Sequence, residues 1–169
     1  MNTARNILDR YWSSNSPVPL PVDPFVIAEN AGIAVIPDNS LAGGSSGQAS
    51  YEHSRRTIRF NPQEHKVRQR FTVAHELGHC FLGHLDGING HIVFRDGPAQ
   101  FSASVLRPKE AAANKFAAEL LIPMDTLDYF IMRENITDGY TLAVLFEVST
   151  IAVDIRVKEW QRERSRILA

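Results

Sequence analysis

The sequence contains one cysteine, Cys80, so no disulfide can form within the chain, and a secreted fold held together by internal disulfides is excluded. Neither sign of charge dominates, because 18 lysine and arginine residues are matched by 19 aspartate and glutamate residues. A protein that binds nucleic acid or a membrane through bulk positive charge is therefore not expected. No apolar run is long enough to span a bilayer, and Met1–Asn6 has no apolar leader segment. We expect a cytoplasmic protein.

The chain does contain enough apolar material for a hydrophobic core, since 44% of its 169 residues are hydrophobic and 22% are charged. This length corresponds to one domain, which we expect to cover residues 1–169. Helical patterns come first, then strand patterns, then mostly helical patterns again. That order predicts an α+β fold with a small antiparallel sheet and a helical C-terminal part.

Periodicity and cap residues mark the individual elements. Helices are predicted at Ala4–Trp12, from Pro24 onward, and at Lys66–His84, Pro108–Leu121, Met124–Arg133, Leu142–Glu147 and Ile151–Trp160. Strands are predicted at Ile33–Ile36, Gln48–Tyr51, Thr57–Phe60 and His91–Phe94. Between the first two strands, residues 40–47 are rich in glycine and serine, which predicts a flexible loop.

The most informative motif is His75-Glu76-Leu77-Gly78-His79, an H-E-x-x-H sequence in the apolar helical pattern. Residues four apart lie on one face of a helix, so His75 and His79 can converge on one zinc ion. Glu76 is turned about 100° around the helix axis and can act as the general base toward an attacking water. The alternative is a core helix that carries two histidines, but a buried glutamate between them would be costly without a metal. Gly78, a poor helix former, indicates close approach by another element.

A catalytic zinc ion usually has three protein ligands, and four residues are candidates for the third. His84 would suit an extended H-E-x-x-H-x-x-G-x-x-H pattern, but it comes one position too early and the glycine one too late. His91 is possible, although nothing in the sequence fixes its orientation. Glu110 is the strongest candidate, because Asn114 follows it at i+4 and could hydrogen-bond the outer nitrogen of a ligating histidine. Glu119 is the second choice on this helix. The alternative for Glu110 is a first-turn glutamate favoured by the helix dipole.

Two separate motifs closely resemble the ImmA/IrrE family of zinc metallopeptidases: Ala74–His79, and Glu110–Pro123, which follows an E-x-x-A-N-x-F-A-x-x-L-L-x-P pattern. The resemblance extends over about residues 24–157. It implies a zincin-like domain whose sheet packs on the H-E-x-x-H helix. It also implies one catalytic Zn²⁺ held by His75, His79 and Glu110, with Glu76 as the catalytic base.

In such proteins the usual partner is a helix-turn-helix repressor or antitoxin that is cleaved or inactivated in a mobile-element, stress-response or toxin–antitoxin system. The resemblance therefore implies a regulatory endopeptidase whose substrate is a helix-turn-helix regulator encoded nearby. The alternative is a zinc-binding regulator or toxin component that binds its repressor without cutting it. The presence of Glu76 argues mildly against this alternative, because a scaffold would not need a general base.

A DNA-binding reading is also possible, because Leu142–Val153 has the pattern of a helix-turn-helix. Its second helix would offer Arg156 and Lys158 but also Asp154 and Glu159, whereas a phosphate-binding surface needs a clustered basic face. We therefore expect this segment to pack against the peptidase core. A solvated face is predicted for the C-terminal basic group Arg162, Arg164 and Arg166.

Two features of the reaction stay open in the sequence. The strand at Gln48–Tyr51, or its hairpin mate, could pair with an extended substrate, by analogy with other zincins. The residue that assists zinc in stabilising the oxyanion is not identified, and the candidates are His84, His91, Tyr51 and Tyr140.

Overall fold

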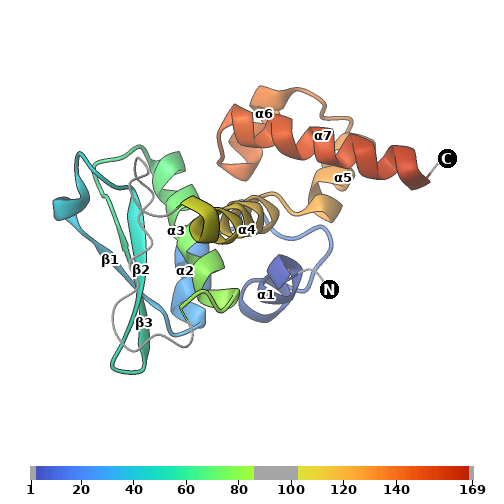
Figure 1. The fold of residues 1–169 in the computed structure, drawn as a ribbon. Coiled ribbons are helices and arrows are strands. Elements are labelled where there is room, and N and C mark those ends of the chain that lie inside the picture. The colour runs from blue at the N-terminus through green and yellow to red at the C-terminus, as the bar shows by residue number, and fades with distance from the viewer. Residues whose placement is uncertain (1–2, 86–102, 168–169) are drawn as a thin grey trace.

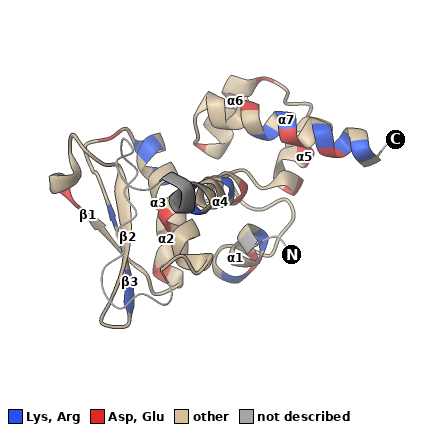
Figure 2. Ribbon diagram, viewed as in Figure 1, with Lys and Arg blue, Asp and Glu red and all other residues tan. Residues whose placement is uncertain are grey.

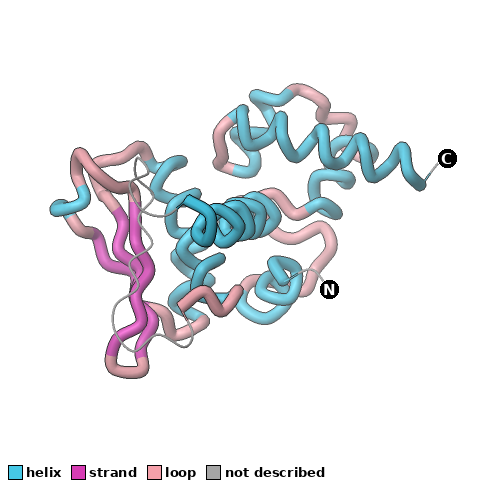
Figure 3. Tube along the Cα trace, viewed as in Figure 1, coloured by secondary structure: helices cyan, strands magenta, loops and turns pink. Residues whose placement is uncertain are grey.

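The computed structural model describes residues 3–85 and 103–167, in which a small sheet lies on one side of a group of helices (Figures 1 and 3). The helices are α1 (Thr3–Tyr11), α2 (Pro24–Asn30), α3 (Lys66–Phe81), α4 (Ala103–Leu121), α5 (Met124–Met132), α6 (Gly139–Phe146) and α7 (Thr150–Ile167), with a 3-10 turn, η1 (Asn39–Leu41). The strands are β1 (Ala34–Pro37), β2 (Gly47–Glu52) and β3 (Arg55–Phe60). This confirms the predicted α+β class with a helical C-terminal part.

The sheet is mixed, with strand order β1-β3-β2. β2 and β3 form an antiparallel hairpin, and its turn residues His53 and Ser54 both have positive φ. β1 pairs with β3 in parallel, with Ala34 opposite Thr57. The prediction of a small antiparallel sheet is therefore confirmed for β2 and β3 and wrong for β1, which pairs in parallel. The connection that follows β1 places β2 at the opposite edge of the sheet, and β3 then lies between β1 and β2. Strand patterns in the sequence do not reveal this order. The predicted strand at His91–Phe94 lies outside the described residues.

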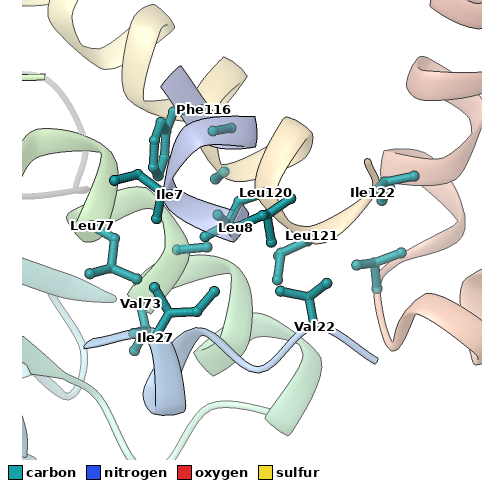
Figure 4. Packing of buried hydrophobic residues seen from close by; sticks show 14 of the residues in the cluster. Ile7, Leu8, Val22, Ile27, Val73, Leu77, Phe116, Leu120, Leu121 and Ile122 are labelled. Atoms are coloured by element: carbon teal, nitrogen blue, oxygen red, sulfur yellow. The ribbon is translucent and has the colours of Figure 1, made fainter. Parts of the chain in front are cut away.

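Helix α3 is the centre of the fold, because it packs against β2 and β3 on one side and against α4 on the other. Every residue of the segment 72–80 is buried. This follows from a sequence that is apolar or small around the whole helix, apart from the two histidines and the glutamate. The side chains of α1, α2, α3 and α4 meet in one core (Figure 4). Its labelled members are Ile7, Leu8, Val22, Ile27, Val73, Leu77, Phe116, Leu120, Leu121 and Ile122.

Helix α3 ends at Phe81, three residues before the predicted end at His84. Gly83 has a φ of 71°, the left-handed conformation that commonly terminates helices. The backbone N–H of His84 donates to the carbonyl of His79 at 3.1 Å, which closes the Schellman turn. His84 therefore lies beside the last turn of α3 instead of continuing it.

Helix α4 begins at Ala103, five residues before Pro108, where the sequence predicted its start. Proline has no N–H and is disfavoured inside helices, which is why the pattern placed the boundary there. Pro108 is exposed and lies inside the helix, as its sixth residue. As a result Glu110 is the eighth residue of α4. The dipole of the first turn therefore does not explain its position.

Helices α3 and α4 approach each other closely at Gly78. A Cβ atom at this position would lie 3.1 Å from Ala113 Cα and 3.2 Å from the Ala113 carbonyl oxygen. The close approach predicted from the sequence is confirmed.

Gly78→Val is expected to lower the free energy of unfolding by about 1–3 kcal/mol, because the added methyl groups would overpack the backbone of α4. Urea unfolding of the metal-free protein measures the change. Gly44→Val is the matched control, since a Cβ atom at position 44 would meet nothing within 4 Å. Equal stabilities of the two variants would contradict the tight α3–α4 contact.

The C-terminal helices pack against the rest of the chain, as predicted for the helix-turn-helix-like segment. Leu142, Phe146 and Val153 are buried. Arg156 is 4% exposed and donates to the Ile122 carbonyl at 3.1 and 3.0 Å, so it is not available to a phosphate. Among the described residues, no helix combines the length and apolar character needed to cross a membrane.

The surface of α7 carries both signs of charge (Figure 2). Within its C-terminal basic group, Arg162 and Arg166 are exposed, and Arg164 pairs with Asp128 at 2.8 Å. The expectation of a solvated face is confirmed for Arg162 and Arg166.

Candidate metal centre

Helices α3 and α4 bring three predicted ligands together. The Nε2 atoms of His75 and His79 are 3.0 Å apart. Glu110 reaches them from α4, with Oε2 3.1 Å from His75 Nε2 and Oε1 3.3 Å from His79 Nε2. The ligand atoms of all three residues lie within 4.8 Å of one another, close enough to hold one metal ion. The close packing at Gly78 allows this approach, because it lets α4 come near the histidine-bearing face of α3.

The charges of the three groups suit a divalent cation. Burial lowers the pKa of His79. Burial acts to raise the pKa of Glu110, but hydrogen bonds to His75 and His79 outweigh it and lower the pKa to about 2. Near neutral pH the site therefore offers a neutral His79 and an ionised Glu110, which are the protonation states that metal binding requires. The donor set of two imidazoles and one carboxylate fits a hydrolytic zinc site.

Each histidine is also held through its outer nitrogen. His75 Nδ1 lies 2.9 Å from Asn114 Oδ1. An amide oxygen can only accept, so Nδ1 carries the proton and Nε2 presents its lone pair to the site. This is the contact predicted for Asn114 from its spacing to Glu110. His79 Nδ1 lies 2.9 Å from His84 Nδ1.

The other candidates for the third ligand do not join this group. His84 contacts the outer nitrogen of His79 and is not part of the metal-binding cluster found in the described residues. Glu119 is nine residues after Glu110 on α4, which puts it on the opposite face of the helix. Its carboxylate lies 3.9 Å from Lys115 Nζ, and burial raises its pKa. His91 lies outside the described residues.

Glu76 is fully buried and lies next to the start of β2. A Cβ atom at Gly47 would lie 3.3 Å from Glu76 Oε1 and would collide with Thr72 Cγ2. Glycine at the first residue of β2 therefore leaves space for the methyl group of Thr72 and for the neighbouring carboxylate of Glu76. Sequence patterns did not predict this role of Gly47. The sequence does change from a glycine-serine loop to a strand at this position, but this change does not indicate that Gly47 lies beside Glu76.

Cys80 adjoins His79 in the chain but is a poor ligand candidate. Burial, followed by the charge of Glu76, raises the pKa of its thiol to about 12. The thiol therefore stays protonated at neutral pH, whereas a metal needs the thiolate. Of the tyrosines considered for oxyanion stabilisation, Tyr51 on β2 is 43% exposed and Tyr140 on α6 is 72% exposed.

Comparisons with known proteins agree with the family resemblance of the sequence. A family model described as the IrrE N-terminal-like domain, a peptidase domain, matches residues 28–158. No protein with a curated description matches the sequence significantly. Among solved structures, a Mycobacterium tuberculosis transcriptional regulator is similar in fold, with a TM-score of 0.55 and 14% sequence identity. The similarity covers 89% of this chain and 44% of that chain, so this chain spans less than half the regulator's length.

Proposed function

Because the chain belongs to the family of IrrE N-terminal-like peptidase domains, as its two motifs indicated, we propose that it is a zinc-dependent metallo-endopeptidase. The observation that carries this proposal is the convergence of His75, His79 and Glu110 from two helices, with Glu76 adjacent to the first histidine on α3. Two histidines and one glutamate are a ligand set of known zinc peptidases.

In the proposed reaction His75, His79 and Glu110 would hold a zinc ion, which when bound would supply a lowered pKa for the attacking water and polarisation of the scissile carbonyl. Glu76 takes the proton from the water and then gives it to the leaving amine. Its complete burial supports this role, because bulk water is kept away from the carboxylate. Asn114 supports the reaction indirectly, since it fixes the tautomer and orientation of His75.

We place the substrate along β2. This strand is an edge of the sheet in the described part of the chain, and its partner β3 lies on its inner side. An extended peptide could add to that edge through main-chain hydrogen bonds. Gly47, the first residue of β2, lies beside Glu76, so a peptide that reached this end of the strand would come near the general base.

For the natural substrate we propose a helix-turn-helix transcriptional regulator or antitoxin encoded near this protein. This part of the proposal draws on the resemblance to ImmA/IrrE proteins. The same resemblance supports a regulatory setting, such as a mobile element, a stress response or a toxin–antitoxin system.

The test measures metal content and cleavage together. We expect the purified protein to bind about one Zn²⁺ per chain and to cut the neighbouring helix-turn-helix protein at a defined bond. Removal of zinc with a chelator should abolish cleavage, and added Zn²⁺ should restore it. A protein that binds zinc and the regulator but never cuts would favour the non-cleaving alternative. Absence of zinc binding would contradict the metal assignment itself.

A further inference from the structure

His84 meets His79 as a result of local chain geometry. Gly83, in its left-handed conformation, ends α3, and the backbone N–H of His84 then donates to the His79 carbonyl at 3.1 Å. This turn reverses the chain beside the residue that it has just passed. The two side chains also meet, with 2.9 Å between their Nδ1 atoms. His84 is thus tied to His79 through both backbone and side chain.

The proton between the two rings can be assigned from what His79 does on its other side. His79 Nε2 faces His75 Nε2 at 3.0 Å and Glu110 Oε1 at 3.3 Å, which is the position of the metal. A ligating Nε2 needs its lone pair, so the proton of the neutral ring must be on Nδ1. That N–H requires an acceptor, and the atom 2.9 Å away is His84 Nδ1.

We infer that His84 is a positioning residue that accepts the Nδ1–H of His79 and thereby fixes the tautomer and ring orientation of this ligand. The inference rests on the metal site proposed above. It assigns His84 neither of the roles considered from the sequence, which were direct ligation and stabilisation of the oxyanion. Asn114 holds His75 in the corresponding way from α4. The two ligands are therefore each oriented by a different outer partner.

A matched pair of substitutions at one position tests this role. Asparagine and leucine have side chains of the same branched shape, but only asparagine offers an oxygen acceptor, as Asn114 does toward His75. We expect His84→Leu to bind Zn²⁺ about 10–100-fold more weakly than the unmodified protein. We expect His84→Asn to retain most of the affinity. His53→Asn is the control for loss of a histidine, since His53 is exposed in the β2–β3 turn and asparagine tolerates its positive φ.

A second measurement uses the Zn²⁺-loaded protein, in which Nε2 of His79 is occupied and the ring proton is on Nδ1. The ¹H chemical shift and the solvent exchange rate of this Nδ1–H report whether it is hydrogen-bonded. We expect a downfield-shifted, slowly exchanging Nδ1–H in the unmodified protein and in His84→Asn, and loss of that shift with faster exchange in His84→Leu. A residue with a purely structural role would leave both readouts unchanged. Thermal unfolding of each variant shows whether it is folded, and if His84→Leu is not, retention or loss of the hydrogen-bonded Nδ1–H and of affinity in His84→Asn decides the question.

Two results would overturn the inference. In the first, His84→Leu binds Zn²⁺ as tightly as His53→Asn and keeps the downfield-shifted, slowly exchanging Nδ1–H of His79. In the second, the visible spectrum of the Co²⁺-loaded protein shows that His84→Leu and His84→Asn both lose a nitrogen ligand, which would make His84 a direct ligand. Failure of the proposed function is distinguishable from both, because the unmodified protein would then bind no zinc, or would bind zinc without cutting its partner while the effects of the two substitutions on affinity could still be measured.

Discussion

Replacement of Glu76 by glutamine is expected to slow peptide hydrolysis by about 10²–10⁴-fold, the usual contribution of a general base, while zinc binding stays intact. Glutamine keeps the size of the side chain but cannot accept a proton from water at neutral pH. Glu76 lies outside the cluster of ligand atoms formed by His75, His79 and Glu110, so the metal site should survive the substitution. The loss should appear in the turnover number.

The measurement compares the two zinc-loaded proteins on the neighbouring helix-turn-helix protein and on fluorescently labelled casein as an unfolded probe. Zinc content is determined on the same samples. Glu119→Gln provides the control for removal of a carboxylate, because this glutamate is partly buried and faces Lys115 on α4. Full activity of Glu76→Gln would show that another group is the base. Loss of zinc from Glu76→Gln would give Glu76 a structural or ligating role instead.

The parts of the site that depend on helical spacing could be predicted from the sequence. His75 and His79 lie on one face of α3 because they are four residues apart, and Glu110 and Asn114 share a face of α4 for the same reason. Their order along α4 then lets Glu110 reach the inner nitrogens and Asn114 the outer nitrogen of His75. This prediction held although the start of α4 was misplaced, because the register within a helix does not depend on where the helix begins.

The parts that depend on contacts between distant segments could not be predicted in this way. The parallel pairing of β1 with β3 follows from the path of the connection between β1 and β2. The space that Gly47 leaves for Glu76 depends on how the sheet docks on α3, and no periodicity encodes that docking. His84 shows an intermediate case. The glycine before it is a signal for the end of α3, but no pattern in the sequence indicates that the His84 side chain then meets the outer nitrogen of His79.

Glu110 should be the residue whose loss most weakens metal binding outside the H-E-x-x-H motif. We expect Glu110→Gln to reduce Zn²⁺ affinity by more than about 100-fold, beyond the usual effect of removing an outer partner of a ligand. The carboxylate supplies the only negative charge among the three converging ligands, and its pKa of about 2 keeps it ionised under all ordinary conditions. Glutamine offers a neutral oxygen in its place. Competition with a chromophoric chelator measures the affinity.

The comparison with Glu119→Gln makes this test specific to the position, because both glutamates belong to the same helix and both substitutions remove one carboxylate. Glu119→Gln should leave zinc affinity unchanged, since Glu119 lies on the opposite face of α4. Equal losses in the two variants would point to a general effect of charge or of helix stability. A large loss of zinc affinity only in Glu119→Gln would show that Glu119, and not Glu110, is the third ligand. A loss confined to Glu110→Gln would establish that two motifs, 31 residues apart between His79 and Glu110, build one metal centre.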